Sequence, residues 1–558
     1  MPTFVLIKTN LTMRYLVIIL LLAQFQIVAS ESETISYKFR VYLKDKHTTE
    51  FEKTDPLTYL SQKAIDRRKE QCVEIDSTDY PVSYVYKNEI INQGVDVVAE
   101  SKWFNTVVVH CDDSLQIKVI ENLSFVDSVK FVWRGQQYTQ EEHIRPRLIA
   151  LDCETDTLTD SYFGISDKQF AFHNAQSMHN AGFQGKGIDI AVIDAGFTNI
   201  DVIPAFVHSF IRGYKNFIPD GNMFSSIDHG TKVLSTMALN LPHKVMGSAP
   251  QSSYLLLRSE DEHSEFPVEE DYWVAAIEYA DSLGVKLVNT SLGYNHFDDS
   301  SLNYTHKELT GVESFISKAT NAAFDKGMLI VGSAGNEGNK EWLKITVPGD
   351  SEKMLTIGAV TLDSTVTSFS SHGPTVDGRI KPDLVSIGSM TVTIGQTGLI
   401  SYTNGTSFSS PFLTGLIGSL WSVNPQLNRN ELIDIVRQSA HQFQRPDSIL
   451  GYGIPDFKIA YQNVLRTLKK QENGIINELM QVSMIEKESM IIALNEPQYD
   501  AHSYSLRVLN KDGNTIISEK FDSSEYIFTI SEAIREENDE LFVVVQSPFE
   551  QLTVRLKI

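Results

Sequence analysis

Ser407 is the residue whose sequence context most favours chemistry. It lies in residues 404–411, where a glycine turn delivers a serine to the first turn of an apolar helix expected over residues 412–421. Gly405 allows backbone dihedrals that a side chain would forbid, and Pro411 is tolerated early in a helix. Free backbone N–H groups at such a helix start can hold an oxyanion. A helix cap is the ordinary reading of this serine taken alone, so the case for a nucleophile depends on other residues.

Three other polar residues follow buried strands or open a helix. Asp194 ends the apolar strand 188–193 and is followed by small residues. His229 opens a helix predicted over residues 230–240, and Asn336 leaves another buried strand through small residues. Taken one at a time, these are a capping or metal-binding aspartate, an ordinary histidine at a helix start and a turn asparagine.

Together the four residues supply what acyl transfer requires. A serine hydroxyl such as that of Ser407 is a weak nucleophile until a base, here His229, removes its proton. The histidine needs an anionic partner that fixes its tautomer, which Asp194 can provide. The tetrahedral oxyanion needs a donor, and the amide of Asn336 beside a backbone N–H can serve.

The order Asp, His, Asn, Ser in these local contexts resembles that of subtilisin-like serine proteases, and the resemblance covers roughly residues 160–465. It implies that Asp194, His229 and Ser407 form a catalytic triad. It also implies that Asn336 is the oxyanion donor alongside the Ser407 backbone N–H. The expected activity is that of a serine endopeptidase working through an acyl-enzyme intermediate.

Several positions depart from the family's usual pattern. Lys232 stands where the family usually has a second histidine, three residues after the catalytic one. Ala195 follows the aspartate where serine or threonine is more frequent, and Phe408 and Ser409 replace a Met-Ala pair. None of these changes removes a reacting group, so the expected mechanism is retained.

Two short segments resemble the family's substrate-binding strands. The first follows the strand 285–289 and looks like the family's edge strand, with which an extended substrate pairs as an additional β-strand. Because both segments consist mostly of small residues, we expect a pocket open enough for a large apolar side chain. The six residues are Ser291, Leu292 and Gly293 in one segment and Ser333, Ala334 and Gly335 in the other.

Residues 155–465 alternate near-continuous apolar strands with amphipathic helices. Beyond residues 230–240, helices are expected over residues 269–283 and 311–326. This pattern predicts an α/β fold with a doubly wound parallel sheet, here a subtilisin-like catalytic domain. In such sheets active residues gather at the carboxyl ends of the strands.

Regions of a different pattern flank this domain. Residues 31–150 combine alternating strands, as at 37–43 and 103–109, with a helix predicted over 59–69, which indicates a small α+β domain. Residues 466–558 hold short alternating strands with a hairpin turn at 510–513, which predicts a small β-sandwich.

The resemblance gives the flanking domains expected roles. The N-terminal domain is expected to be a propeptide that inhibits its own enzyme and assists its folding, with a cleavage boundary near residues 140–160. Part of it, residues 51–68, looks like the N-terminal regions of Bacteroidetes-type secreted subtilases. The end of the C-terminal domain faintly resembles sorting domains of the type IX secretion route. A permanent accessory domain remains the alternative at each end.

The first 30 residues are expected to be a signal peptide. Lys8 and Arg14 precede an apolar stretch at 16–23, and small residues follow at 28–30. The stretch is too short to span a bilayer comfortably, and no other stretch is apolar enough, so we expect a secreted or cell-surface protein without a transmembrane span. A net charge of −23 argues against nucleic acid as a partner. The resemblance implies protein or peptide substrates.

No cofactor is expected to be required. The resemblance admits calcium, because members of the family often bind it, but no oxygen-ligand spacing of motif quality occurs. The polar stretch 294–310, with Asp298, Asp299 and Asn303, is therefore interpreted as a solvated loop and no metal ligands are assigned. The cysteines, three in all, are too few and too widely spaced for a disulfide framework or a usual zinc site.

Two other functions fit less of the sequence. A binding or adhesion protein on an idle catalytic scaffold would be expected to have lost a triad residue, and none is lost. An α/β-hydrolase esterase would carry Gly-x-Ser-x-Gly ahead of its aspartate and histidine, which is the reverse of the order seen here. The cleaved sequence, the pairing of the cysteines and the oligomeric state are not readable.

Overall fold

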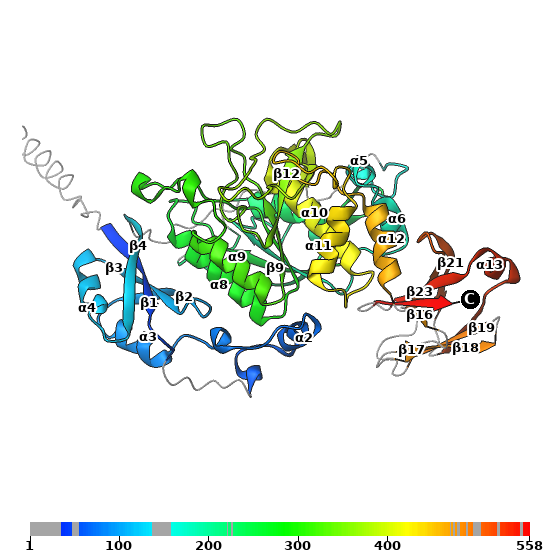
Figure 1. The fold of residues 1–558 in the computed structure, drawn as a ribbon, viewed down its shortest axis with the longest axis horizontal. Coiled ribbons are helices and arrows are strands. Elements are labelled where there is room, and N and C mark those ends of the chain that lie inside the picture. The colour runs from blue at the N-terminus through cyan, green and yellow to red at the C-terminus, as the bar shows by residue number, and fades with distance from the viewer. Residues whose placement is uncertain are drawn as a thin grey trace, which may run out of the picture.

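The computed structural model describes residues 35–46, 55–136 and 158–557, with internal gaps at 220, 225–226, 469, 472–474, 477–479, 487–488, 495–503, 522–524 and 547–550. The predicted signal peptide, most of the predicted cleavage boundary and Cys153 lie outside the described residues. An N-terminal domain, a large central domain and a C-terminal β domain follow one another along the chain (Figure 1). Within the described part of the chain, no helix combines the length and the apolar character needed to cross a membrane.

Seven parallel strands form the central sheet, in the order β13-β12-β11-β10-β5-β9-β6. The chain enters at β5, builds one side of the sheet through β6 and β9, and then builds the other side from β10 to β13. The winding therefore reverses between β5 and β10, and the predicted doubly wound sheet is confirmed. The strands are β5 (Asp189–Asp194), β6 (Phe210–Asn216), β9 (Ser253–Arg258), β10 (Leu287–Thr290), β11 (Leu329–Ser333), β12 (Met354–Val360) and β13 (Leu384–Ile387).

Helices cover the sheet in two pairs. The neighbouring helices α8 and α9 lie against β5, β9, β11 and β12, and α7 packs with α10, which crosses β10 to β13 (Figure 1). Apolar residues of the sheet and of both helix pairs form one continuous core. The helices of this domain are α5 (Asp167–Phe172), α6 (Gln176–Asn180), α7 (His229–Ala238), α8 (Val268–Ser282), α9 (Phe315–Asp325), α10 (Thr406–Trp421), α11 (Arg429–Gln438) and α12 (Phe457–Thr467); short strand pairs are β7 (Asn240–Leu241) with β8 (Val245–Met246) and β14 (Thr391–Ile394) with β15 (Ile400–Thr403).

Some predicted boundaries were wrong by several residues. The helix expected over 311–326 begins at Phe315, because Gly311 adopts a positive φ of 77° and Ser314 caps the helix by accepting a hydrogen bond from Ser317 N. The helix expected over 59–69 is α2 (Gln62–Glu70), capped in the same way by the preceding serine. In both cases the cap set the start, and hydrophobic periodicity alone did not reveal it.

The N-terminal domain is a four-stranded antiparallel sheet in the order β2-β3-β1-β4, with its own apolar core. The strand expected over 103–109 begins later, since Asn105 has a positive φ of 53°. The domain packs against α8 of the central domain, with β2 closest to that helix. Its elements are β1 (Ile35–Leu43), α2, α3 (Tyr84–Ile91), β2 (Asp96–Ser101), β3 (Thr106–Cys111), α4 (Ile117–Glu121) and β4 (Val126–Gln136).

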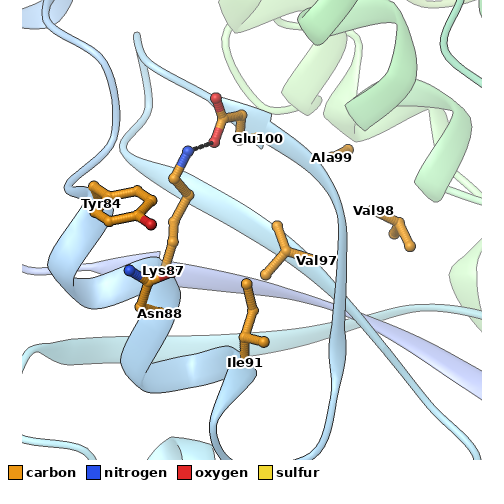
Figure 2. A pocket seen from close by; sticks show the side chains of 8 residues that line it. All are labelled: Tyr84, Lys87, Asn88, Ile91, Val97, Val98, Ala99 and Glu100. Carbon is orange, nitrogen blue, oxygen red and sulfur yellow. Dashed lines mark hydrogen bonds and ion pairs between the residues drawn. The ribbon is translucent and has the colours of Figure 1, made fainter.

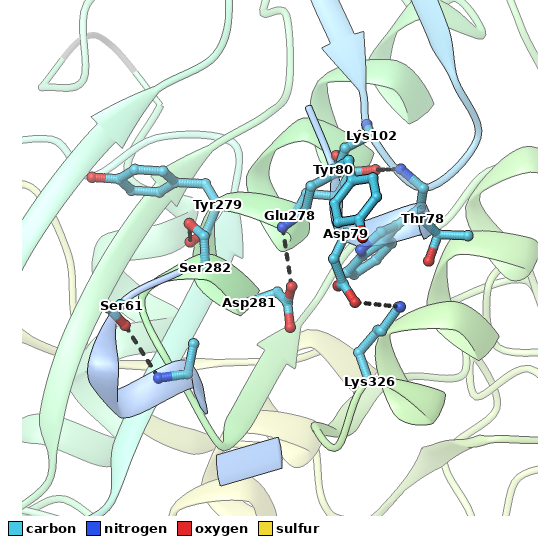
Figure 3. A network of polar contacts seen from close by, with 12 residues as sticks. Ser61, Thr78, Asp79, Tyr80, Lys102, Glu278, Tyr279, Asp281, Ser282 and Lys326 are labelled. Carbon is cyan, nitrogen blue, oxygen red and sulfur yellow. Dashed lines mark hydrogen bonds and ion pairs between the residues drawn. The ribbon is translucent and has the colours of Figure 1, made fainter. Parts of the chain in front are cut away.

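Buried charges join these two domains around Asp281, near the end of α8 (Figure 3). Arg67 and Arg68 of α2 both pair with its carboxylate, Arg68 at 2.9 Å, and Lys102 Nζ lies 3.2 Å away. Burial by itself would raise the pKa of Asp281, but the three cations hold it below its ordinary value. The ionised carboxylate thus depends on groups of the N-terminal domain.

The C-terminal domain contains two sheets, as the short alternating strands predicted. The predicted hairpin turn is confirmed at Asn510–Asn514, where Gly513 adopts a φ of 78°. The domain docks on α12, where Tyr461 Oη donates to Gly513 O at 3.2 Å. One sheet is β16 (Lys470–Gln471), β24 (Gln551–Lys557), β23 (Glu540–Gln546), β20 (Tyr504–Leu509) and β21 (Thr515–Phe521), the other is β17 (Ile475–Ile476), β18 (Met480–Glu486), β19 (Ser489–Leu494) and β22 (Glu525–Thr529), and α13 spans Glu532–Glu537.

Cys72 and Cys111 are free thiols, the first exposed and the second buried. No disulfide joins these two, so a bridge between them, which the sequence left open, is not formed.

The first prediction concerns the Asp281 cluster. Asp281→Asn keeps the side-chain volume but leaves Arg67 buried without an anion and Arg68 with Asp79 alone, so we expect a stability loss of about 3–5 kcal/mol. The measurement is urea unfolding of the full chain in a Ser407→Ala background, which keeps both proteins intact. Asp66→Asn is the matched control, because Asp66 is about half exposed and lies 4.0 Å from Lys69. An equal unfolding midpoint for both variants would contradict the assigned role of Asp281.

Candidate active site

The four residues singled out in the sequence come together at the carboxyl edge of the central sheet, where the winding reverses. Asp194 is the last residue of β5, and His229 is the first of α7, which packs against β5. Asn336 follows β11, and Ser407 is the second residue of α10, which contacts β10, β11 and α7. Strand ends and helix starts therefore present these side chains to one place.

A short hydrogen bond joins the histidine to the aspartate. His229 Nδ1 lies 2.6 Å from Asp194 Oδ1, and Asp194 is fully buried. The same oxygen accepts a hydrogen bond from Ala195 N at 2.8 Å, and among the described residues Oδ2 has no partner. This bond fixes Nδ1 as the protonated nitrogen of the neutral ring and leaves Nε2 as the acceptor.

The pair also sets the basicity of the histidine. Burial disfavours the imidazolium, but the Asp194 carboxylate outweighs this effect, so the pKa of His229 lies above its ordinary value of 6.5. Lys232 acts in the opposite direction and Asp228 in the same direction as Asp194. The His229 side chain is 30% exposed, so a substrate can reach it.

Ser407 lies at the positive end of a fully buried helix. Gly405 caps the helix with a φ of 146°. Residues with a Cβ atom rarely adopt this backbone conformation, whereas glycine adopts it readily. The Ser407 hydroxyl donates to Ser291 O at 3.4 Å, so the hydrogen bond to His229 expected for a resting triad is not formed. The His229 and Phe408 ring centroids are 5.8 Å apart, which places the histidine beside the serine's neighbour. A rotation about the Ser407 Cα–Cβ bond is needed to aim Oγ at the imidazole.

The Asn336 amide is held by its oxygen. Oδ1 accepts hydrogen bonds from Thr406 N at 2.9 Å and Thr406 Oγ1 at 3.0 Å, which leaves the Nδ2 group as the outward donor. Within the described chain, the Ser407 N–H makes no hydrogen bond, as is usual in the first turn of a helix. An amide N–H₂ and a backbone N–H are thus available side by side.

The two predicted substrate segments leave neighbouring strands. Thr290 is paired with Gly332 between β10 and β11, so residues 291–293 and 333–335 follow at the same edge. Ser291 Oγ donates to Ser407 O at 3.1 Å, which ties the first segment to α10. A Cβ on Gly293 would lie 2.2 Å from Thr346 Oγ1, so only glycine fits there. The size of the side chain that this edge accepts stays a prediction.

Thr406 and Thr346 contribute to the site but were not singled out in the sequence. The position of Thr406 next to Ser407 in the sequence could have indicated its role, because a residue beside a nucleophile often helps to hold that nucleophile in place. No local signal marked Thr346, which lies in a loop and reaches Gly293 only through the fold.

The oxygen atoms of the loop considered for calcium accept hydrogen bonds within the loop and from two other segments: Asp298 Oδ2 accepts from Glu265 N at 3.1 Å, and Asp299 Oδ2 lies 3.2 Å from Arg134. Asp299 Oδ1 accepts from Ser301 N at 3.1 Å, and Asn303 Oδ1 accepts from Phe297 N at 2.7 Å. These are turn and capping contacts. The one group of acidic side chains with metal-like spacing in the described residues lies elsewhere, between β9 and the first turn of α8, at Glu260, Glu265 and Glu269.

A hollow on the N-terminal domain lies apart from this site. It is formed between α3 and β2, with the Lys87–Glu100 ion pair of 2.6 Å at one end (Figure 2). None of the residues that line it belongs to the central domain, so it is not the place where the four residues meet.

Known proteins and family models match both the central and the N-terminal domains. The model of the subtilase family matches residues 185–453, and the model of the peptidase S8 propeptide domain of Bacteroidota matches residues 38–146. The thermostable alkaline protease of Halalkalibacterium halodurans is 27% identical over 288 residues, which cover 51% of this chain and 70% of that protein. Subtilisin E of Bacillus subtilis is 26% identical over 377 residues, or 67% of this chain and 85% of that protein.

A solved structure matches the fold as well. The epidermin leader peptide processing serine protease of Staphylococcus aureus aligns with a TM-score of 0.52 and 16% identity, over 78% of this chain and 99% of that one. At that identity the match concerns the fold alone. The family matches rest on sequence, and they cover both the central and the N-terminal domains. The chain therefore belongs to the subtilase family of serine proteases, with a Bacteroidota-type propeptide domain ahead of its catalytic domain.

Proposed function

We propose that this protein is a secreted serine endopeptidase with Ser407 as nucleophile, His229 as general base and Asp194 as the residue that orients the base. The observation that carries the proposal is the buried 2.6 Å contact between His229 and Asp194 beside the start of α10. A neutral histidine held in one tautomer next to a serine at a helix N-terminus is the arrangement that activates a hydroxyl.

The proposed reaction uses only groups of the chain. Ser407 Oγ turns from Ser291 O toward His229 Nε2, gives up its proton there and bonds to the carbonyl carbon of the substrate. The oxyanion accepts hydrogen bonds from the Ser407 N–H and Asn336 Nδ2. His229 then protonates the leaving amine, and the C–N bond breaks to leave an acyl-enzyme. A water molecule, deprotonated by His229, attacks the ester and restores the serine.

The proposed substrate is an extended peptide that lies along Ser291–Gly293 and pairs with this segment as an additional β-strand. Ser333, Ala334 and Gly335 form the opposite wall of the pocket for the residue before the cleaved bond. Since most of these residues are small, a large apolar side chain is the preferred occupant.

The N-terminal domain is proposed to inhibit the enzyme as its own propeptide until cleavage. Its buried contacts to α8 support this role: Arg40 holds Asp271 through two hydrogen bonds, and Glu278 accepts bonds from the backbone of Lys102 and Trp103. Secretion is proposed from the predicted signal peptide, and a sorting role for the C-terminal domain is proposed as the weaker alternative to a plain accessory domain. A catalytically idle binding protein is disfavoured because the chain retains each side chain that the proposed reaction uses.

The second prediction tests the nucleophile. The mature protein is expected to react with a fluorophosphonate probe, and Ser407→Ala is expected to lose labelling and to lower kcat by roughly 10⁶-fold. Ser409→Ala is the control, because Ser409 lies on the same helix turn but donates its hydroxyl to Thr406 O. Labelling of Ser407→Ala at the level of the parent protein would rule out the proposal.

The third prediction tests the oxyanion donor. Asn336→Ala removes Nδ2 and is expected to lower kcat about 10²–10³-fold with a small change in KM, because the bond forms mainly in the transition state. The control is Asn339→Ala, at an exposed position three residues further along the chain. Equal kcat values for the two variants, measured on one peptide substrate, would show that Asn336 is not the donor.

The fourth prediction is the pH dependence of kcat/KM. Only neutral His229 accepts a proton, so activity falls as pH drops through its pKa, which lies above 6.5. Lys232→Ala removes a nearby positive charge and should move this acid limb to higher pH. Asp194→Asn should move the limb to lower pH and reduce the plateau by about 10⁴-fold.

Lys307→Ala, at an exposed site on another loop, is the control for the change of charge. A limb that stays in place in Lys232→Ala, or that moves equally in the control, would refute the assignment to His229.

A further inference from the structure

Three glutamates of the catalytic domain converge between β9 and α8. Glu260 and Glu265 lie in the loop that follows β9, and Glu269 is in the first turn of α8. One carboxylate oxygen from each lies within 4.8 Å of the other two. No ion pair involves any of the three among the described residues, so the acids face one another without a directly bound cation.

Glu269 supplies a second and separate observation. It is fully buried, its Oε1 accepts a hydrogen bond from Asp261 N at 2.6 Å, and its Oε2 has no hydrogen-bond partner in the described part of the chain. A buried carboxylate oxygen without a donor is costly, and such an atom calls for a bound ion or another explanation. The nearby Arg258 donates its Nη1 to Asn222 O at 2.6 Å.

The surroundings make the three acids hard to ionise. Burial, followed by the neighbouring acids, raises the pKa of Glu260 to about 8 and that of Glu269 well above its ordinary value. Burial and then Asp298 raise the pKa of Glu265 to about 7. These acids therefore crowd one another in a buried place, and a bound cation would offset their mutual repulsion.

The kind and number of ligands distinguish among cations. Calcium takes 6–8 oxygen ligands in flexible geometry and is readily held by several protein carboxylates. Magnesium requires near-ideal octahedral geometry, keeps several waters and is usually bound through one or two carboxylates, so three converging glutamates suit calcium better. An all-carboxylate set also excludes the sulfur and imidazole ligands that softer metals prefer.

We propose that Glu260, Glu265 and Glu269 form a calcium site in the catalytic domain. No calcium motif marks this site in the sequence, because two ligands lie at different places in a loop and the third in the first turn of a helix, without the regular spacing of a calcium-binding loop.

The site is joined to the substrate segment through Tyr294. Tyr294 Oη donates a hydrogen bond to Glu260 Oε1, and its backbone exchanges hydrogen bonds with Val347 at 2.9 and 3.1 Å. Tyr294 directly follows Gly293 of the proposed substrate-binding strand. Calcium would therefore hold the loop that buttresses this strand, and its loss is expected to raise KM more than it lowers kcat.

The fifth prediction is measured on the full chain carrying Ser407→Ala, so that binding is scored without activity or self-cleavage. After treatment with a chelator and desalting, calorimetric titration with CaCl₂ should show binding that MgCl₂ does not match. Glu269→Gln should remove one equivalent of calcium or weaken that site at least about tenfold. Calcium should also raise the thermal unfolding midpoint of the parent protein, but raise that of the variant less.

Glu313→Gln is the matched control, because Glu313 is exposed and lies away from the cluster. Glu265→Gln, at a partly exposed position, repeats the test should Glu269→Gln fail to fold. The proposal is overturned if the parent protein binds no calcium, or if a folded Glu269→Gln or Glu265→Gln variant binds calcium with the stoichiometry and affinity of Glu313→Gln.

Discussion

The close packing of α10 against the sheet is the constraint on which the active site depends. Every residue of this helix is buried, and it lies across β10 to β13 (Figure 1). Gly415 and Gly418 allow the approach: a Cβ on Gly415 would lie 2.0 Å from Ser248 Oγ, and one on Gly418 would lie 3.2 Å from Ile190 of β5. Larger residues at these positions would push the helix outward and move Ser407 away from Asp194 and His229.

The charges along α8 show how differently buried carboxylates are satisfied on one helix. Asp271 and Asp281 each meet an arginine of the N-terminal domain, and Glu278 accepts three hydrogen bonds from residues 101–103 of that domain. The N-terminal domain therefore satisfies these three carboxylates of α8 directly. Glu269 receives no contact of this kind, and its Oε2 has no hydrogen-bond partner in the described part of the chain. The proposed calcium ion would supply the positive charge that the N-terminal domain provides to the other three.

Much of the catalytic domain could be predicted from its sequence, because strands buried on both faces are continuous apolar runs and strand ends carry the functional residues. Asp194, His229 and Asn336 were each recognisable from the local element that they end or open. The rotamer of Ser407 was not predictable, since the competing acceptor, Ser291 O, comes from a segment 116 residues away.

Long-range contacts limited the rest of the prediction. A helix was predicted to start too early where a serine cap and a residue with positive φ set its true start, as at Ser314 and Gly311. The glutamate cluster could not be recognised in the sequence, and neither could the role of Thr346. In both cases the residues reach their partners only after a loop has folded back onto another segment. The four motif residues were found because each lies at the end of a regular element, whereas loop residues have no such periodic signal.

Asp194 and the glutamate cluster are both in contact with the end of β9. Ser259 N donates to Asp194 O at 3.1 Å, and the next residue is Glu260, which accepts from Tyr294 at the start of the loop after the substrate-binding strand. A backbone hydrogen bond, one peptide unit and a side-chain hydrogen bond thus link Asp194 to the residue that follows the proposed substrate-binding strand. Because interiors are close-packed, a cation that fixes Glu260 limits movement at both ends of this link. Asp194 and the proposed substrate-binding strand are therefore tied to the same short loop, and the proposed cation would restrain both.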